Sequence, residues 1–153
     1  YYISGVENIR YYEVDHPDVI ERKKETIRKV MGKLPEHVTY VAVDFNTQDV
    51  ETELQNAGYE LSSKALFIWE SVSPYLTKEA NDATFVLVSK ARSGSKIAFS
   101  YTSDSFITGE NLNNKALKRL RRTLVERYKI VVYGYDPNTI ESYLSNGGIL
   151  EVV

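Results

Sequence analysis

Short apolar runs alternate along the chain with longer segments whose apolar residues recur at helical spacing. The runs contain many aromatic and β-branched residues, which favour strands. They cover residues 9–14, 38–43, 65–69 and 96–101, with an ambiguous run at 130–133 and a last one at 149–153. The run at 65–69 is continuously apolar, which is typical of a strand covered on both faces.

Capping residues mark the helices between these runs. Pro17 suits a first helical position and Gly32 a helix end, so we expect a helix between them. Asn46 or Thr47 is expected to cap a short helix through Leu54. A further helix is expected at residues 77–90, with Thr77 as its cap, and others at 114–128 and 136–144, with a polar stretch at 102–113. Strands alternating with helices predict an α/β fold with a parallel sheet and right-handed crossovers.

Three of the strand-like runs end in an acid: Asp15, Asp44 and Glu70. The acids are about one strand–helix–strand unit apart, so in a parallel sheet they would share one edge. Ligands of open α/β sheets bind at the carboxyl ends of the strands, and an acid there commonly accepts hydrogen bonds from ribose hydroxyls. A second acid can bind an exocyclic adenine amine, and a third can face an ammonium group. The alternative for each acid is a local one, as a helix cap or a turn former.

Composition narrows the function classes. The chain has 153 residues, 42% hydrophobic and 26% charged, which fits one ordinary globular domain. It has no cysteine and only two histidines, so we expect no metal site. A net charge of −2, with no apolar run of membrane-spanning length and no signal peptide, argues against nucleic acid or a membrane as partner and favours a cytoplasmic location.

Five segments, in order, resemble one family. They are residues 12–17 (YEVDHP), 41–45 (VAVDF), 67–77 (FIWESVSPYLT), 93–99 (SGSKIAF) and 145–151 (SNGGILE). The first is similar to an E-V-D-x-P segment and the third to an A-E-G-L/V-x-x-Y-L-T block. Together they resemble the leucine carboxyl methyltransferase family, whose members are S-adenosylmethionine-dependent O-methyltransferases. The resemblance implies a Rossmann-like class I methyltransferase fold, mostly a parallel sheet with helices on both faces, as a single domain over residues 1–153.

The resemblance also implies roles for single residues. Asp15 would bind the ribose hydroxyls of S-adenosylmethionine, and Asp44 the adenine amine, with the Phe45 backbone beside the adenine ring. Glu70 would lie near the methionine portion of the cofactor. The pocket would also include Glu13 and Tyr75, although we favour a core position for Tyr75 because buried tyrosines usually serve packing first. The segments suggest no catalytic residue.

The chain departs from the family pattern at its start. The family's first strand and its G-x-G-x-D-T-R loop should precede Ile9, but only eight residues do, and Gly5 stands alone among them. We therefore expect an N-terminally incomplete fold, with a gap in the sheet between the strands that end at Asp15 and Glu70. Such a fragment should bind S-adenosylmethionine weakly or not at all.

Two other function classes stay open beside a methyltransferase. The first is a nicotinamide-dependent oxidoreductase, which would use Asp15 in the same way but would have no role for Asp44 or Glu70. The second is a non-catalytic α/β domain that binds a partner protein. The methyl acceptor is expected to be a carboxylate or hydroxyl of a small molecule or protein. A basic helix at residues 114–128 is expected to bury Leu117, Leu120, Leu124 and Tyr128 and to leave its charges in water.

Overall fold

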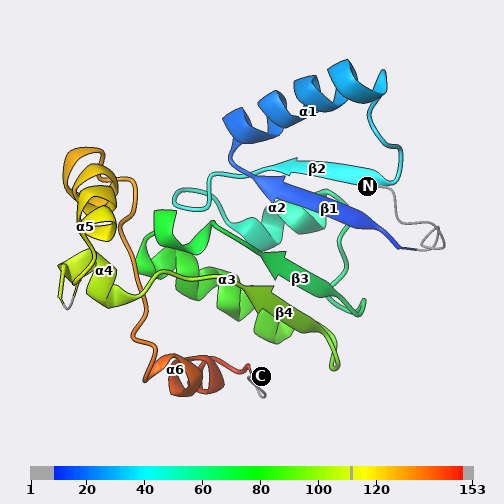
Figure 1. Cartoon of the computed structure of the whole chain (residues 1–153). Helices are drawn as coiled ribbons and strands as arrows, with labels where there is room; N and C mark the ends of the chain where they lie inside the picture. The colour runs from blue at the N-terminus through cyan, green and yellow to red at the C-terminus, as the bar shows by residue number, and fades with distance from the viewer. Residues whose placement is uncertain (1–8, 111, 150–153) are drawn as a thin grey trace. The chain divides into compact units, whose positions relative to one another are not determined.

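The computed structural model describes residues 9–110 and 112–149 (Figure 1). The chain forms two compact units, Tyr1–Glu60 and Leu61–Val153. The strands that the structure describes make two two-stranded parallel sheets, one in each unit. The expected α/β class with parallel strands is therefore confirmed. None of the described helices is both long and apolar enough to cross a membrane.

In the first unit, strand β1 pairs with β2 and helix α1 covers the pair (Figure 1). The core is aliphatic, and Ile20 of α1 and Val43 after β2 are both fully buried. Pro17 begins α1, and Gly32 ends it in a left-handed conformation (φ 79°), as predicted. The elements are β1 (Tyr11–Asp15), α1 (Pro17–Met31), β2 (Val38–Ala42) and α2 (Val50–Asn56).

Helix α2 begins at a different cap from the predicted one. Asp49 accepts hydrogen bonds from the backbone N–H groups of Glu51 and Thr52, so it is the N-cap in place of Asn46 or Thr47. The helix therefore begins at Val50, which is buried together with Leu54. Val50 and Leu54 are four residues apart wherever the helix begins, so their spacing fits a start at residue 47 or 48 as well as a start at Val50. The apolar periodicity therefore could not show which residue is the N-cap.

In the second unit, strand β3 pairs with β4, and helix α3 packs on one face of the pair. Phe85 of α3 lies 5.3 Å, ring centre to ring centre, from both Trp69 of β3 and Phe99 of β4. The elements are β3 (Leu66–Trp69), a 3₁₀ turn η1 (Ser73–Tyr75), α3 (Lys78–Lys90), β4 (Lys96–Phe99), α4 (Asp104–Thr108), α5 (Lys115–Arg121), a π-helical turn η2 (Arg122–Arg127) and α6 (Ile140–Asn146).

Two predictions of burial in the second unit are wrong. Leu66 and Ile68 of β3 are 64% and 73% exposed, because alternate side chains of a strand point to opposite faces and α3 covers only the Trp69 face. On the basic helix, Leu117, Leu120 and Tyr128 are exposed rather than buried. The polar stretch at 102–113 contains the short helix α4, which its composition did not indicate.

The end of the chain partly matches the prediction. The ambiguous run at 130–133 is not a strand; Val132 and Tyr133 donate backbone hydrogen bonds to the Pro74 carbonyl instead. Helix α6 begins at Ile140, four residues after Asp136, whose carbonyl accepts the first hydrogen bonds of that turn. Of the last predicted strand, residues 150–153 lie outside the described part of the chain.

Candidate functional site

The first unit places two of the predicted carboxylates at one edge of its sheet. Asp15 is the last residue of β1, and Asp44 follows β2 by two residues. The parallel pairing continues beyond β2, since the Val43 N–H donates to the Asp15 carbonyl at 2.9 Å. Asp15 and Asp44 therefore both lie at the carboxyl ends of neighbouring parallel strands, where α/β sheets bind ligands.

Both carboxylates have local hydrogen bonds and keep acceptor capacity. The Asp15 carboxylate accepts the His16 N–H at 2.7 Å, and the Asp44 carboxylate accepts the Asn46 N–H at 3.0 Å. The Asn46 backbone and then the Thr47 hydroxyl hold the pKa of Asp44 below its ordinary value. Asp44 is thus ionised at neutral pH, and a carboxylate has about four lone-pair directions, so ligand donors can still be accepted.

The alternative role as helix caps fits neither acid. The side chain that accepts at the start of α1 is His16, and at α2 it is Asp49. Asp44 does shape a turn, as the local reading predicted. Glu13 lies in the middle of β1, where its carboxylate pairs with Lys23 of α1, and Phe45 is half-buried directly after Asp44.

The second unit has its own carboxyl edge, at the ends of β3 and β4. Glu70 is exposed directly after β3, and Ser71 follows with a left-handed backbone (φ 57°) that a residue with a Cβ rarely adopts. Ser100, directly after β4, secures this turn: its hydroxyl accepts the Ser71 N–H at 2.8 Å. Its carbonyl also accepts the Ser73 hydroxyl at 3.1 Å. Strained backbone that the surrounding structure fixes is common at ligand sites.

A cavity of about 380 Å³ opens at this edge of the second unit. Pro74 lines it, and Ser71, Ser100 and Thr102 line its strand-end side. Tyr75 is 47% exposed, so the preferred reading of Tyr75 as a core residue is wrong. The remaining walls are aromatic and aliphatic: Tyr75, Tyr101, Phe106, Leu120, Leu124 and Val131.

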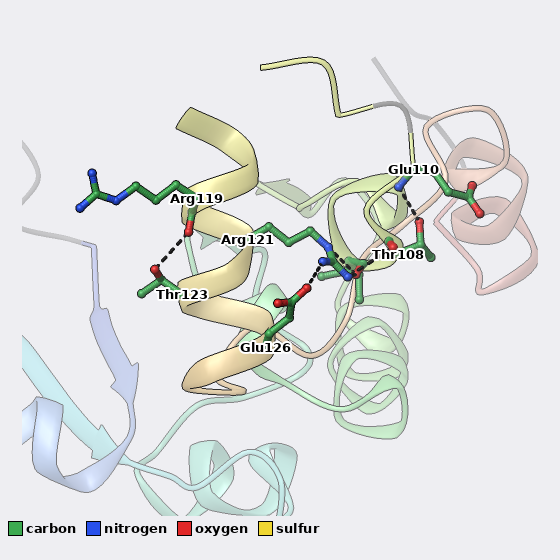
Figure 2. A network of polar contacts seen from close by, with 7 residues as sticks. Thr108, Glu110, Arg119, Arg121, Thr123 and Glu126 are labelled. Atoms are coloured by element: carbon green, nitrogen blue, oxygen red, sulfur yellow. Dashed lines mark hydrogen bonds and ion pairs between the residues drawn. The ribbon is translucent and has the colours of Figure 1, made fainter. Parts of the chain in front are cut away.

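One arginine joins the two helices that supply the cavity wall. Arg121 of α5 donates to the Ile107 carbonyl at 2.8 Å and the Thr108 carbonyl at 3.3 Å, at the end of α4. It also pairs with Glu126, and Figure 2 shows it reaching toward Thr108 while Arg119 points away. The main chain then passes into the π-helical turn η2, a feature that occurs often at functional sites. Arg121 therefore sets the position of Phe106 relative to Leu120 and Leu124.

Sequence reasoning missed most of this wall. The apolar spacing of residues 117–128 was visible, but it was interpreted as packing against a core, whereas Leu120 and Leu124 face the cavity. Nothing in the sequence marked Ser71 or Ser100 as site residues. A positive φ at a single serine, or a hydrogen bond between two loops, does not change the pattern of apolar and polar positions. Across residues 9–110 and 112–149, no group of three or more metal-ligating side chains comes together.

The two parallel strand pairs, their covering helices and the acids at the strand ends define an α/β protein with carboxylates at the carboxyl ends of its strands. The sequence pattern of the leucine carboxyl methyltransferase family matches residues 1–89, more than half of the chain. The chain therefore belongs to the leucine carboxyl methyltransferase family.

Relatives bear the name "Putative S-adenosyl-L-methionine-dependent methyltransferase". YktD of Bacillus subtilis is 28% identical over 109 residues, 71% of this chain and 36% of its own length. A Mycobacterium bovis protein is 36% identical over 97 residues, 63% of this chain and 32% of its own. A Mycobacterium tuberculosis protein is 29% identical over 147 residues, 90% of this chain and 45% of its own. The chain thus matches 32–45% of the length of these relatives.

Proposed function

We propose that the protein carrying this sequence is an S-adenosylmethionine-dependent O-methyltransferase. The observation that carries the proposal is the family match over residues 1–89, because that segment holds all four predicted cofactor residues: Asp15, Asp44, Phe45 and Glu70. Bound S-adenosylmethionine would supply a methyl group on a positively charged sulfur, which is already electrophilic. The protein's own part is then mainly to hold the two reactants in line.

The donor set of the first unit fits this cofactor. Asp15 and Asp44 offer carboxylate oxygens at the ends of adjacent parallel strands, and the lowered pKa of Asp44 keeps it an acceptor at neutral pH. In the proposal, Asp15 accepts the ribose hydroxyls and Asp44 the adenine amine. The Phe45 backbone meets the adenine ring, and Glu70 serves the methionine portion.

The proposal includes a fold as well as a site. We propose that residues 1–153 belong to a single Rossmann-like class I domain, with a mostly parallel sheet and helices on both faces. The parallel pairing within each unit supports it. The acceptor would be a carboxylate or a hydroxyl of a small molecule or protein. The family match favours this function over a nicotinamide oxidoreductase or a partner-binding domain.

The test is the change Asp15→Asn in the native polypeptide that carries this sequence. The amide keeps the side-chain shape and removes the charge that accepts the ribose hydroxyls. We expect S-adenosylmethionine binding to weaken by about 1.5–3 kcal/mol, about 10- to 150-fold in Kd, in isothermal titration calorimetry.

The matched control is Asp18→Asn, three residues later, whose side chain is 86% exposed on the first turn of α1. It removes the same charge near the same helix and should leave the Kd unchanged. Equal affinity of wild type and Asp15→Asn would remove Asp15 from the site. No binding to the wild type at all would overturn the proposed function.

A further inference from the structure

The cavity of the second unit has an aromatic lining, which membership of the family does not by itself predict. Its volume of about 380 Å³ lies at the small end of the roughly 300–1,000 Å³ that ligand pockets occupy. Three aromatic rings line it, those of Tyr75, Tyr101 and Phe106. Tyr75 and Tyr101 are 47% and 38% exposed, so large apolar surfaces face the opening. Such surfaces are stabilised when a flat, apolar ligand covers them.

Polar groups are concentrated on one side of the cavity, at the strand ends. The Ser100 hydroxyl accepts the Ser71 N–H, which leaves the Ser100 hydroxyl hydrogen for a second partner. A ligand oxygen is the natural partner at that position, because a hydroxyl both donates and accepts. Few polar groups converging in an apolar cleft are the pattern that orients a small ligand.

The charge of Arg121, beside the helical wall, already has partners. The Arg121 guanidinium donates to the Ile107 and Thr108 carbonyls and pairs with Glu126 (Figure 2). A carboxylate ligand placed among these apolar walls would lose its hydration without gaining that cation, which is costly. An uncharged ligand with one or two hydroxyls has no such cost.

We infer that this cavity binds an uncharged aromatic alcohol, with its ring between the tyrosines and its hydroxyl at Ser100. The inference rests on the proposed function in one respect, namely that this ligand is the methyl acceptor. Its hydroxyl oxygen would then form the new O–CH3 bond as the methyl–sulfur bond of S-adenosylmethionine breaks, S-adenosylhomocysteine would be the leaving group, and the hydroxyl proton would pass to water. It narrows the acceptor from a carboxylate or a hydroxyl to the hydroxyl of a small aromatic molecule. Arg121 is a positioning residue here, since it holds the wall and does not contact the ligand.

The test compares two fluorescent probes that share a ring system and differ in charge, 2-naphthol and 2-naphthoate. Binding to the native polypeptide is measured by fluorescence titration, without S-adenosylmethionine. We expect 2-naphthol to bind at least about tenfold more tightly, because the naphthoate carboxylate pays the cost of desolvation. Equal binding, or tighter binding of 2-naphthoate, would overturn the inference.

Two leucines of helix α5 provide a matched pair of variants. Leu120 lines the cavity and Leu117 does not, yet they are 47% and 43% exposed, so arginine is tolerated equally at both. Leu120→Arg should weaken 2-naphthol binding at least about tenfold, because a guanidinium replaces an apolar wall. Leu117→Arg should change it less than twofold. If both variants behave alike, the cavity is not the binding site.

A separate arm distinguishes this inference from the proposed function. S-adenosylmethionine binding is measured on the same three proteins and should be equal in all of them. If 2-naphthol binds as described but the cofactor does not bind, the proposed function fails, and the acceptor role fails with it. If the cofactor binds and the two leucine variants are indistinguishable toward 2-naphthol, the inference alone fails.

Discussion

At the residue scale, the hydrogen bonds that shape the loop after β2 also favour the ionised form of the Asp44 carboxylate. It accepts the Asn46 N–H at 3.0 Å, and this bond and the Thr47 hydroxyl hold its pKa below the ordinary value of 3.8. The folded protein therefore favours the ionised form more than the unfolded chain does. This contribution to stability is fully present above the unfolded pKa and is lost as the pH falls through the lowered pKa.

The change Asp44→Asn tests that coupling. The amide oxygen can still accept the Asn46 N–H, but the charge is gone, so the variant should be less stable than wild type at pH 7. The difference should shrink as the pH falls below 3.8 and through the lowered pKa of Asp44, because wild-type Asp44 then becomes neutral as well. Urea unfolding at a series of pH values measures it. A difference that stays constant with pH would show that the charge does not stabilise the loop.

The caps show which residue roles can be predicted from the sequence. Gly32 and Thr77 act within four positions of their partners, so their roles were visible in the sequence and the structure confirms them. Asn46, Thr47 and Asp49 are all good caps close together, and Asp49 is the one used. That choice depends on where Val50 and Leu54 pack, which is information about the tertiary structure.

At the element scale, periodicity showed which side of an element is apolar but not what covers it. The apolar stripe on α5 and the continuous apolar run of β3 were both interpreted as buried, yet Leu117 and Ile68 are exposed. Leu120, from the same stripe, lines the cavity instead. Sequence patterns could thus predict that these elements exist, whereas the cavity depends on the path of α4 and η2, which no local pattern encodes.

The 3₁₀ turn η1 depends on one buried side chain of helix α3. Asn81 is fully buried, and its amide group donates to the carbonyls of Ser73 at 3.1 Å, Leu76 at 3.2 Å and Thr77 at 2.9 Å. The change Asn81→Ala leaves these carbonyls without that donor in a buried setting. We expect the free energy of unfolding to fall by about 2–4 kcal/mol, measured by chemical denaturation.

The control for this element is Asn113→Ala, at an exposed position before α5, which should change the free energy of unfolding by less than about 0.5 kcal/mol. Because η1 carries Pro74 and Tyr75 of the cavity, Asn81→Ala should also weaken 2-naphthol binding. If the free energy of unfolding of Asn81→Ala equals that of the wild type, η1 keeps its shape without this side chain.

At the scale of the whole molecule, the chain distributes its predicted site over two units. Asp15, Asp44 and Phe45 belong to the first, and Glu70 and Tyr75 to the second. Spacing in the sequence predicted that each acid follows a strand, which the structure bears out within each unit. Spacing cannot predict how separate sheets join, because that depends on pairing between strands far apart in the chain.

If the two units belong to a single domain, as proposed, they should unfold together in one cooperative transition. Trp69 is the only tryptophan of these 153 residues and lies in the second unit against Phe85. Its fluorescence reports unfolding there once any tryptophan outside this sequence is replaced by phenylalanine. Ile20→Ala removes a fully buried side chain from the first unit and should cost about 2–5 kcal/mol. In one cooperative domain, it lowers the urea midpoint of the Trp69 signal in the native polypeptide.

The change Phe85→Ala is the positive control, since it opens the Trp69 environment itself and should cost about 3–5 kcal/mol. Val30→Ala, on the same helix as Ile20 but 80% exposed, should leave the Trp69 midpoint where it is. Circular dichroism measures the loss of helix α1 separately. If Ile20→Ala lowers the urea midpoint of the helical signal while the midpoint of the Trp69 fluorescence stays unchanged, the units unfold separately. The proposal of one Rossmann-like domain over residues 1–153 would then be wrong, although each carboxyl edge would keep its own binding test.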